Sequence, residues 1–163
     1  MRRKLVVLAS TALAAAAALS GAGLANASAQ SATATATESF QILQTSATSH
    51  EFSLIATGEF TAVGTFDSST GTSGTITLPG GTLQLTGVAG SPSQFFNTKT
   101  CLLVFYQDGT YTLSDGTGAY ADVTGSGTSK VKILGITTNS GGVCTHTFTS
   151  FQEVITGRGP ITK

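Results

Sequence analysis

The chain has 163 residues, of which 10% are charged and 40% hydrophobic, and its formal net charge is +0. This length suits one domain, and so few charges exclude a chain that charge repulsion keeps disordered. The balanced charge also leaves no basic footprint for nucleic acid, which we do not expect as a partner.

The first 29 residues have the pattern of a secretory signal peptide. Three basic residues open the chain, an Ala-rich apolar stretch follows, and small residues mark cleavage near Ala27 or Ala29. The uninterrupted apolar stretch is shorter than the roughly 20 residues of a membrane-spanning helix. We therefore expect a secreted, extracellular protein that has no membrane association after cleavage. The paired Arg2 and Arg3 leave both the general and the twin-arginine export routes open.

Residues 30–39 are small and polar and contain no large apolar side chain. Such a segment buries too little surface to offset the entropy of ordering, so we expect a flexible leader there. A single folded domain is expected over residues 40–163. Loss of the three basic residues at the start leaves five basic and eight acidic ones, a mature net charge of −3.

Strands are expected along the rest of the chain, beginning with a short one at 41–45. Period-2 alternation is strongest over 51–67, where apolar or small residues, Phe60 among them, alternate with mostly polar ones. Two glycines on the apolar side predict one sharply bent strand. The polar side includes Glu51 and Glu59, which we expect to face solvent.

Two turn signals predict hairpins. Pro79–Gly81 separates two short alternating runs. Asp108–Gly109 follows the apolar run CLLVFY and is the strongest hairpin signal in the chain. A two-residue turn there would place Tyr106 opposite Tyr111, with Leu113 on the same apolar face.

Two further strands are expected at 129–136 and 145–156, with a loop at 137–143 between them. No stretch after the signal peptide has a helical period, and the abundance of Thr, Val and Phe favours strands. The fold class predicted is all-β, with about eight antiparallel strands. A closed barrel and a two-sheet sandwich both remain open, and the glycines within strands favour the barrel.

Cys101 and Cys144 are the only cysteines, and export would place them in an oxidising compartment. They lack the close spacing of a metal or redox pair. We expect them to form a disulfide, which would stabilise the fold by on the order of 4 kcal/mol.

The stretch Gly116–Gly127 (GTGAYADVTGSG) resembles the Gly-rich strand of allene oxide cyclase and dirigent-type barrels. The chain is also similar, over about residues 56–160, to small secreted actinobacterial proteins of unassigned function. The shared pattern lies at Phe96-Asn97, Thr100-Cys101 and Gly109-Thr110-Tyr111. The resemblance implies an eight-stranded, calycin-like barrel whose interior can hold an apolar molecule. The catalytic residues of the family do not transfer, because no matching set of polar groups is found here.

The candidate ligand-binding residues are Tyr106, Tyr111, Phe60 and Leu113. A tyrosine inside a small barrel supplies apolar surface and one hydroxyl that can orient a ligand. The alternative is that these rings simply fill the core, because an eight-stranded barrel is just wide enough for its side chains.

No catalytic, metal-binding or cofactor-binding motif is present in the sequence. His146 and Glu153 lie seven positions apart on one expected strand, so they should point to opposite faces as two solvent-facing residues. His50 and Glu51 are adjacent and point apart for the same reason. We expect no metal and no cofactor.

The residues leave three functions open. The first is a secreted barrel that binds a small apolar molecule, or a stable extracellular module, without evident catalysis. The second is a cyclase or isomerase acting on an unsaturated lipid-like or phenolic substrate, which needs an ionisable group facing the cavity. The third is an adhesion or partner-binding module, for which an exposed aromatic patch would be the sign. The oligomeric state is open.

Overall fold

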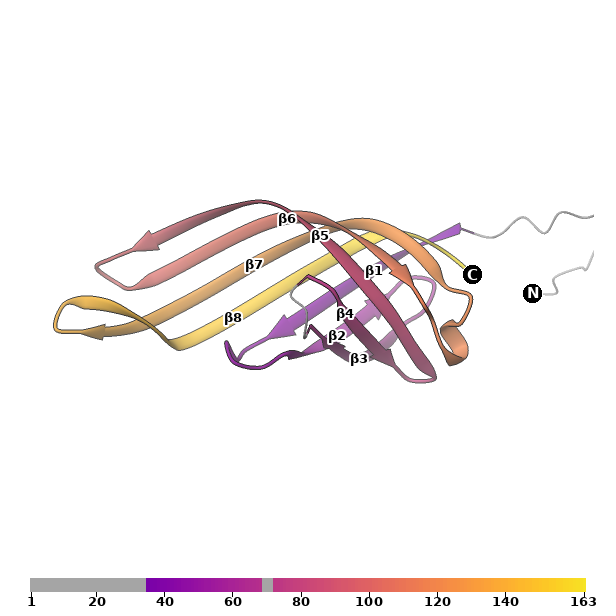
Figure 1. The fold of residues 1–163 in the computed structure, drawn as a ribbon, viewed down its shortest axis with the longest axis horizontal. Helices are drawn as coiled ribbons and strands as arrows, with labels where there is room; N and C mark the ends of the chain where they lie inside the picture. The colour runs from indigo at the N-terminus through magenta and orange to yellow at the C-terminus, as the bar shows by residue number, and fades with distance from the viewer. Residues whose placement is uncertain (1–34, 69–71) are drawn as a thin grey trace, which may run out of the picture. The chain divides into compact units, whose positions relative to one another are not determined.

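The computed structural model describes residues 35–68 and 72–163, which form a ring of eight antiparallel strands (Figure 1). The strands are β1 (Thr35–Gln44), β2 (Glu51–Thr57), β3 (Ala62–Asp67), β4 (Gly74–Leu78), β5 (Gly81–Asn97), β6 (Leu102–Ser114), β7 (Thr124–Ser140) and β8 (Val143–Thr162). Each strand pairs with the next, and β1 also pairs with β8, which closes the sheet into a barrel. The predicted all-β, antiparallel barrel is confirmed.

Strand β1 begins before the expected start of the domain. The expected signal peptide and residues 30–34 lie outside the described residues. Residues 35–39, however, pair along β8 from Thr35 opposite Thr162 to Ser39 opposite Arg158. The prediction of a flexible leader was therefore wrong for these five residues. Backbone pairing with a neighbouring strand orders them although most of their side chains are small.

The alternating segment 51–67 forms two strands, so the prediction of one bent strand was wrong. Strands β2 and β3 pair with each other, with Ala56 opposite Ala62. Gly58 opens the turn between them with a φ of 145°, which favours glycine. A Cβ there would also lie 2.3 Å from the carbonyl oxygen of Thr37. Alternation alone could not show this reversal, because the inward and outward pattern continues across the turn.

The predicted hairpin at Asp108–Gly109 is absent, because β6 runs straight through it. Gly109 pairs with Ala89 of β5 on one side and with Ser129 of β7 on the other. Those two ladders satisfy the backbone groups on both sides of β6, and they override the local turn signal. Tyr106 and Tyr111, five positions apart on one strand, therefore point to opposite faces of the sheet.

Two further turns, after β4 and after β7, are each two residues long. The hairpin turn after β4 is confirmed, since Leu78 pairs with Gly81 across Pro79 and Gly80. The loop expected at 137–143 shrinks to Gly141–Gly142, because β7 continues to Ser140. Both glycines have positive φ, of 61° and 85°, which suits a two-residue turn.

One end of the barrel is closed by the connection between β6 and β7. This connection carries the short 3₁₀ helix η1 (Gly118–Tyr120), so the Gly-rich stretch is strand only from Thr124. Tyr120 is buried, and its hydroxyl donates a hydrogen bond to the carbonyl oxygen of Pro79 (3.2 Å). Its ring packs against Phe60, with the ring centroids 5.2 Å apart. Large buried side chains, including Leu54 and Ile76, fill this half of the barrel.

The other end differs, because β5, β6, β7 and β8 are much longer than β1–β4. Figure 1 shows these four strands running past the short ones as two projecting hairpins, β5–β6 and β7–β8. The two hairpins are held side by side by pairing between β6 and β7, which continues out to Leu102 opposite Ile136.

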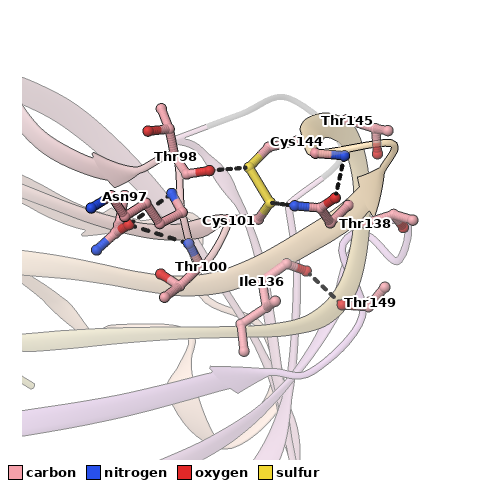
Figure 2. Close-up of a disulfide and its surroundings, with 12 residues drawn as sticks. Asn97, Thr98, Thr100, Cys101, Ile136, Thr138, Cys144, Thr145 and Thr149 are labelled. Atoms are coloured by element: carbon pink, nitrogen blue, oxygen red, sulfur yellow. Dashed lines mark hydrogen bonds between the residues drawn. A yellow bond between two sulfur atoms is a disulfide. The ribbon is translucent and has the colours of Figure 1, made fainter.

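A disulfide joins the tips of the two hairpins. Cys101, in the turn after β5, is bonded to Cys144 at the start of β8, and their Cα atoms are 5.4 Å apart (Figure 2). The side-chain amide of Asn139 donates to the sulfur of Cys101 (3.5 Å), and the backbone N–H of Thr137 donates to its carbonyl oxygen (3.0 Å). The predicted disulfide is confirmed.

We expect removal of this disulfide to lower the melting temperature. A crosslink between residues 43 positions apart lowers the conformational entropy of the unfolded chain. That restriction is worth on the order of 4 kcal/mol and corresponds to on the order of 10 °C in a domain of this size. Circular dichroism melts of the reduced protein and of the Cys101→Ser/Cys144→Ser variant would measure it. An unchanged melt after thiol titration has verified reduction would contradict a stabilising role.

Candidate functional site

A cavity of about 260 Å³ lies inside the barrel, near the level at which the short strands end. Its walls come from β1, β3, β5, β6, β7 and β8 and are mostly apolar. The apolar side chains on these walls include Phe40, Ile42, Phe66, Leu85, Phe105, Val131, Ile133 and Ile155. Val131 and Ile133 thus face inward, and the alternating Lys130 and Lys132 are exposed.

Tyr111 forms the boundary between this cavity and the filled half of the barrel. Its side chain is only 3% exposed, and its ring packs edge-on against Phe40, with the centroids 6.1 Å apart. The ring lies over two glycines, Gly127 of β7 and Gly157 of β8. A Cβ at Gly127 would lie 2.8 Å from the Tyr111 ring, and one at Gly157 would lie 3.2 Å from it. The ring fits there because neither Gly127 nor Gly157 carries a side chain.

A buried carboxyl group, Glu38, lies near Tyr111 on the closed side. Glu38 is 0% exposed, and its Oε2 accepts a hydrogen bond from the backbone N–H of Phe60 (3.2 Å). Burial raises the pKa of Glu38. Burial, and then the charge of Glu38, raise the pKa of Tyr111 to about 12. Neither Glu38 Oε1 nor the Tyr111 hydroxyl has a hydrogen-bond partner among the described residues.

A second carboxyl group, Glu153, lies in the cavity wall. It is half-buried on β8, where Gln44 of β1 and Ile133 of β7 lie opposite it. Burial raises the pKa of Glu153. The prediction that Glu153 faces solvent was therefore wrong, whereas His146 is exposed as expected.

The sequence contains a local signal for the inward position of Glu153. Phe151, Glu153 and Ile155 alternate, and an apolar residue on each side of a carboxyl at period 2 places it on the inner face of a strand. Glu38 has the same signal, because it precedes Phe40 and Ile42 at the same period, but it fell within the expected leader.

Of the four residues expected to bind a ligand, the structure brings only Tyr111 to the cavity. Leu113 and Phe60 belong to the packed core beneath it. Tyr106 is 48% exposed on the outer face, where Lys132 Nζ lies 5.7 Å from its ring centroid, so its expected place beside Tyr111 was wrong. The straight course of β6 is the physical reason.

Glu51 and Glu59, the carboxyl groups considered for an inward position, are both exposed. Within residues 35–68 and 72–163, no three His, Cys, Asp or Glu side chains gather as metal ligands. No helix in the same ranges is long and apolar enough to span a membrane. Comparison with family models, curated proteins and solved structures finds no match.

We expect Glu38→Gln to raise the melting temperature at neutral pH. The pKa of Glu38 is higher in the folded protein than its usual 4.5, so its contribution to stability is present below pH 4.5 and falls as the pH rises through the folded pKa. The variant lacks that fall, and its advantage should grow with pH. Melts from pH 4 upward would measure this difference. Melts of Glu153→Gln would show separately how much of the pH dependence comes from Glu153, the other carboxyl group whose pKa burial raises. Parallel curves of melting temperature against pH for wild type and Glu38→Gln would contradict a raised pKa at Glu38.

Proposed function

We propose that the protein is secreted and binds a small apolar molecule in the barrel cavity. The observation that carries this proposal is the cavity itself, apolar on most of its wall and bounded by the Tyr111 ring. Its volume of about 260 Å³ is near the lower end of ligand-binding pockets, roughly 300–1,000 Å³, so the ligand is small. Relationship to allene oxide cyclase and dirigent-type barrels is part of the proposal and rests on Gly116–Gly127 alone.

An aromatic wall continues from the cavity along the inner face of the projecting strands. Phe105 lines the cavity, and further out Phe148 packs against Phe151, with the centroids 5.3 Å apart. Phe148 lies over Gly135, where a Cβ would come within 2.4 Å of its ring. Gly135 is two positions from Ile133 of the cavity wall and so shares its face. A ligand too long for the cavity could lie along this wall.

Secretion is supported by two features that are independent of the cavity. The first 29 residues have the pattern of a signal peptide, and the Cys101–Cys144 disulfide suits an oxidising compartment.

Two other functions each have one observation in their favour. The cyclase or isomerase hypothesis needs an ionisable group at the cavity, and Glu153 and Tyr111 both line it. The partner-binding hypothesis needs exposed aromatic residues, and Phe95 and Tyr106 on the outer face are 58% and 48% exposed. Apolar binding is the better supported of the three, because it uses the whole cavity wall.

We expect native mass spectrometry of protein from its own culture medium to show a bound small molecule. The polypeptide mass should correspond to cleavage near Ala27 or Ala29 and be two hydrogens lighter than the reduced chain. An added mass that disappears on denaturation would identify the ligand. Conversion of that ligand on incubation would favour the enzyme, and the mass of a second polypeptide would favour partner binding. A bare chain that takes up no apolar compound would contradict the proposal.

We expect Val131→Phe to weaken binding of the neutral fluorescent probe phenylnaphthylamine at least about tenfold. The larger ring would occupy the cavity that the probe needs, since Val131 is in its wall. Val63→Phe is the matched control, because Val63 is 67% exposed on β3 and does not line the cavity. Fluorescence titration would compare the two variants with wild type. Equal affinity in all three would place the probe elsewhere.

A further inference from the structure

We propose that the cavity selects apolar molecules that end in a positively charged amine, and that the carboxylate of Glu153 binds this amine. The inference rests on the proposed function, because it specifies the class of ligand for the same cavity.

The wall carries negative charge only. Among the described residues that line the cavity, Glu153 and Asp108 are the only charged ones, and none is Lys, Arg or His. Asp108 is exposed and forms an ion pair with Lys130 (2.9 Å) outside the cavity. A ligand with a carboxylate would therefore meet no positive partner and one unbalanced negative group, whereas an ammonium group would meet its counter-ion.

Glu153 is free to take such a partner. Among the described residues, no hydrogen bond or ion pair involves its side chain. Its neighbours across the ladders are Ile133, which is apolar, and Gln44, whose side-chain amide donates to the carbonyl oxygen of Ser49. The hydrogen bond recorded for the Gln44 side chain thus goes to a backbone carbonyl and not to the carboxyl group of Glu153.

An ammonium group would remove an energetic cost that Glu153 bears alone. An ionised carboxylate without a partner in an apolar wall is unfavourable, and burial accordingly raises the pKa of Glu153. Pairing with a cation in this weakly solvated place favours the ionised form and forms a charge-assisted hydrogen bond. A neutral hydroxyl at the same position would gain a hydrogen bond but no ion pair.

The same pairing makes the affinity for an amine depend on pH. Gln44 and Ile133 lie beside Glu153, and Tyr111 lines the same cavity, whereas the Asp108 side chain pairs with Lys130 outside it. No cationic side chain among the described residues lines the cavity. Binding of an amine requires Glu153 to be ionised, so affinity should rise as the pH rises through its pKa. It should then stay constant until the amine itself loses its proton.

The test compares octylamine, octanol and octanoate, which share one chain and differ in the end group. Each displaces phenylnaphthylamine from the mature, disulfide-bonded protein at pH 7. We expect octylamine to bind at least about tenfold more tightly than the other two. In Glu153→Gln that preference should vanish, because the glutamine amide carries no charge. Glu51→Gln is the matched control, since it removes the same charge from an exposed residue away from the cavity.

The outcomes separate the inference from the proposed function. Octanol binding without a preference for the amine, or a preference that survives in Glu153→Gln, overturns the amine inference and leaves apolar binding intact. Failure of every probe, phenylnaphthylamine included, overturns both. If Glu153→Gln fails to fold, the pH series on wild type decides: octylamine affinity that does not fall on acidification overturns the inference.

Discussion

The unequal lengths of the paired strands determine where this barrel ends. Strand β1 has 10 residues and β8 has 20, so β1 can cover only half of its neighbour. Their ladder runs from Thr35 opposite Thr162 to Gln44 opposite Glu153 and stops there. Beyond that pair the ring has no closing strand, and β5–β8 continue as an open sheet. The cavity and Glu153 both lie at this transition because backbone pairing ends at it.

Large side chains fill the barrel below that level, and several glycines lie in the wall of the cavity. In the closed half, residues such as Leu54, Ile76 and Leu83 are fully buried and occupy the interior. At the level of the cavity, Gly87, Gly109 and Gly157 contribute no side chain to the wall. A Cβ would lie 2.4 Å from the carbonyl oxygen of Thr72 at Gly87, 2.7 Å from that of Val88 at Gly109 and 3.2 Å from the Tyr111 ring at Gly157. These glycines therefore let neighbouring groups approach the wall closely. The Asp-Gly pair that looked like a turn thus supplies part of the cavity wall instead.

Much of the fold could be predicted because it depends on local patterns. Period-2 alternation identified strand conformation in segments such as 51–67, although not the reversal between β2 and β3, and Pro79–Gly81 identified a turn, since each reflects the conformation of adjacent residues. The disulfide followed from cysteine count and an expected compartment. The Asp108–Gly109 hairpin failed because the partners of β6 on both sides come from distant segments, which no local signal contains. One straight strand instead of two then moved Tyr106 out of the predicted site.

The site itself was harder to predict, because the environment of a carboxyl group depends on which strands surround it. Glu38 and Glu153 have the same local pattern, each alternating with apolar residues, and burial raises the pKa of both. Glu38 lies in the closed half, where the backbone N–H of Phe60 binds it and no solvent reaches it. Glu153 lies where the ring opens, in the wall of the cavity, and its carboxyl group has no hydrogen-bond or ion-pair partner among residues 35–68 and 72–163. The end of the β1–β8 ladder therefore separates a carboxyl group that belongs to the core from one that can meet a ligand.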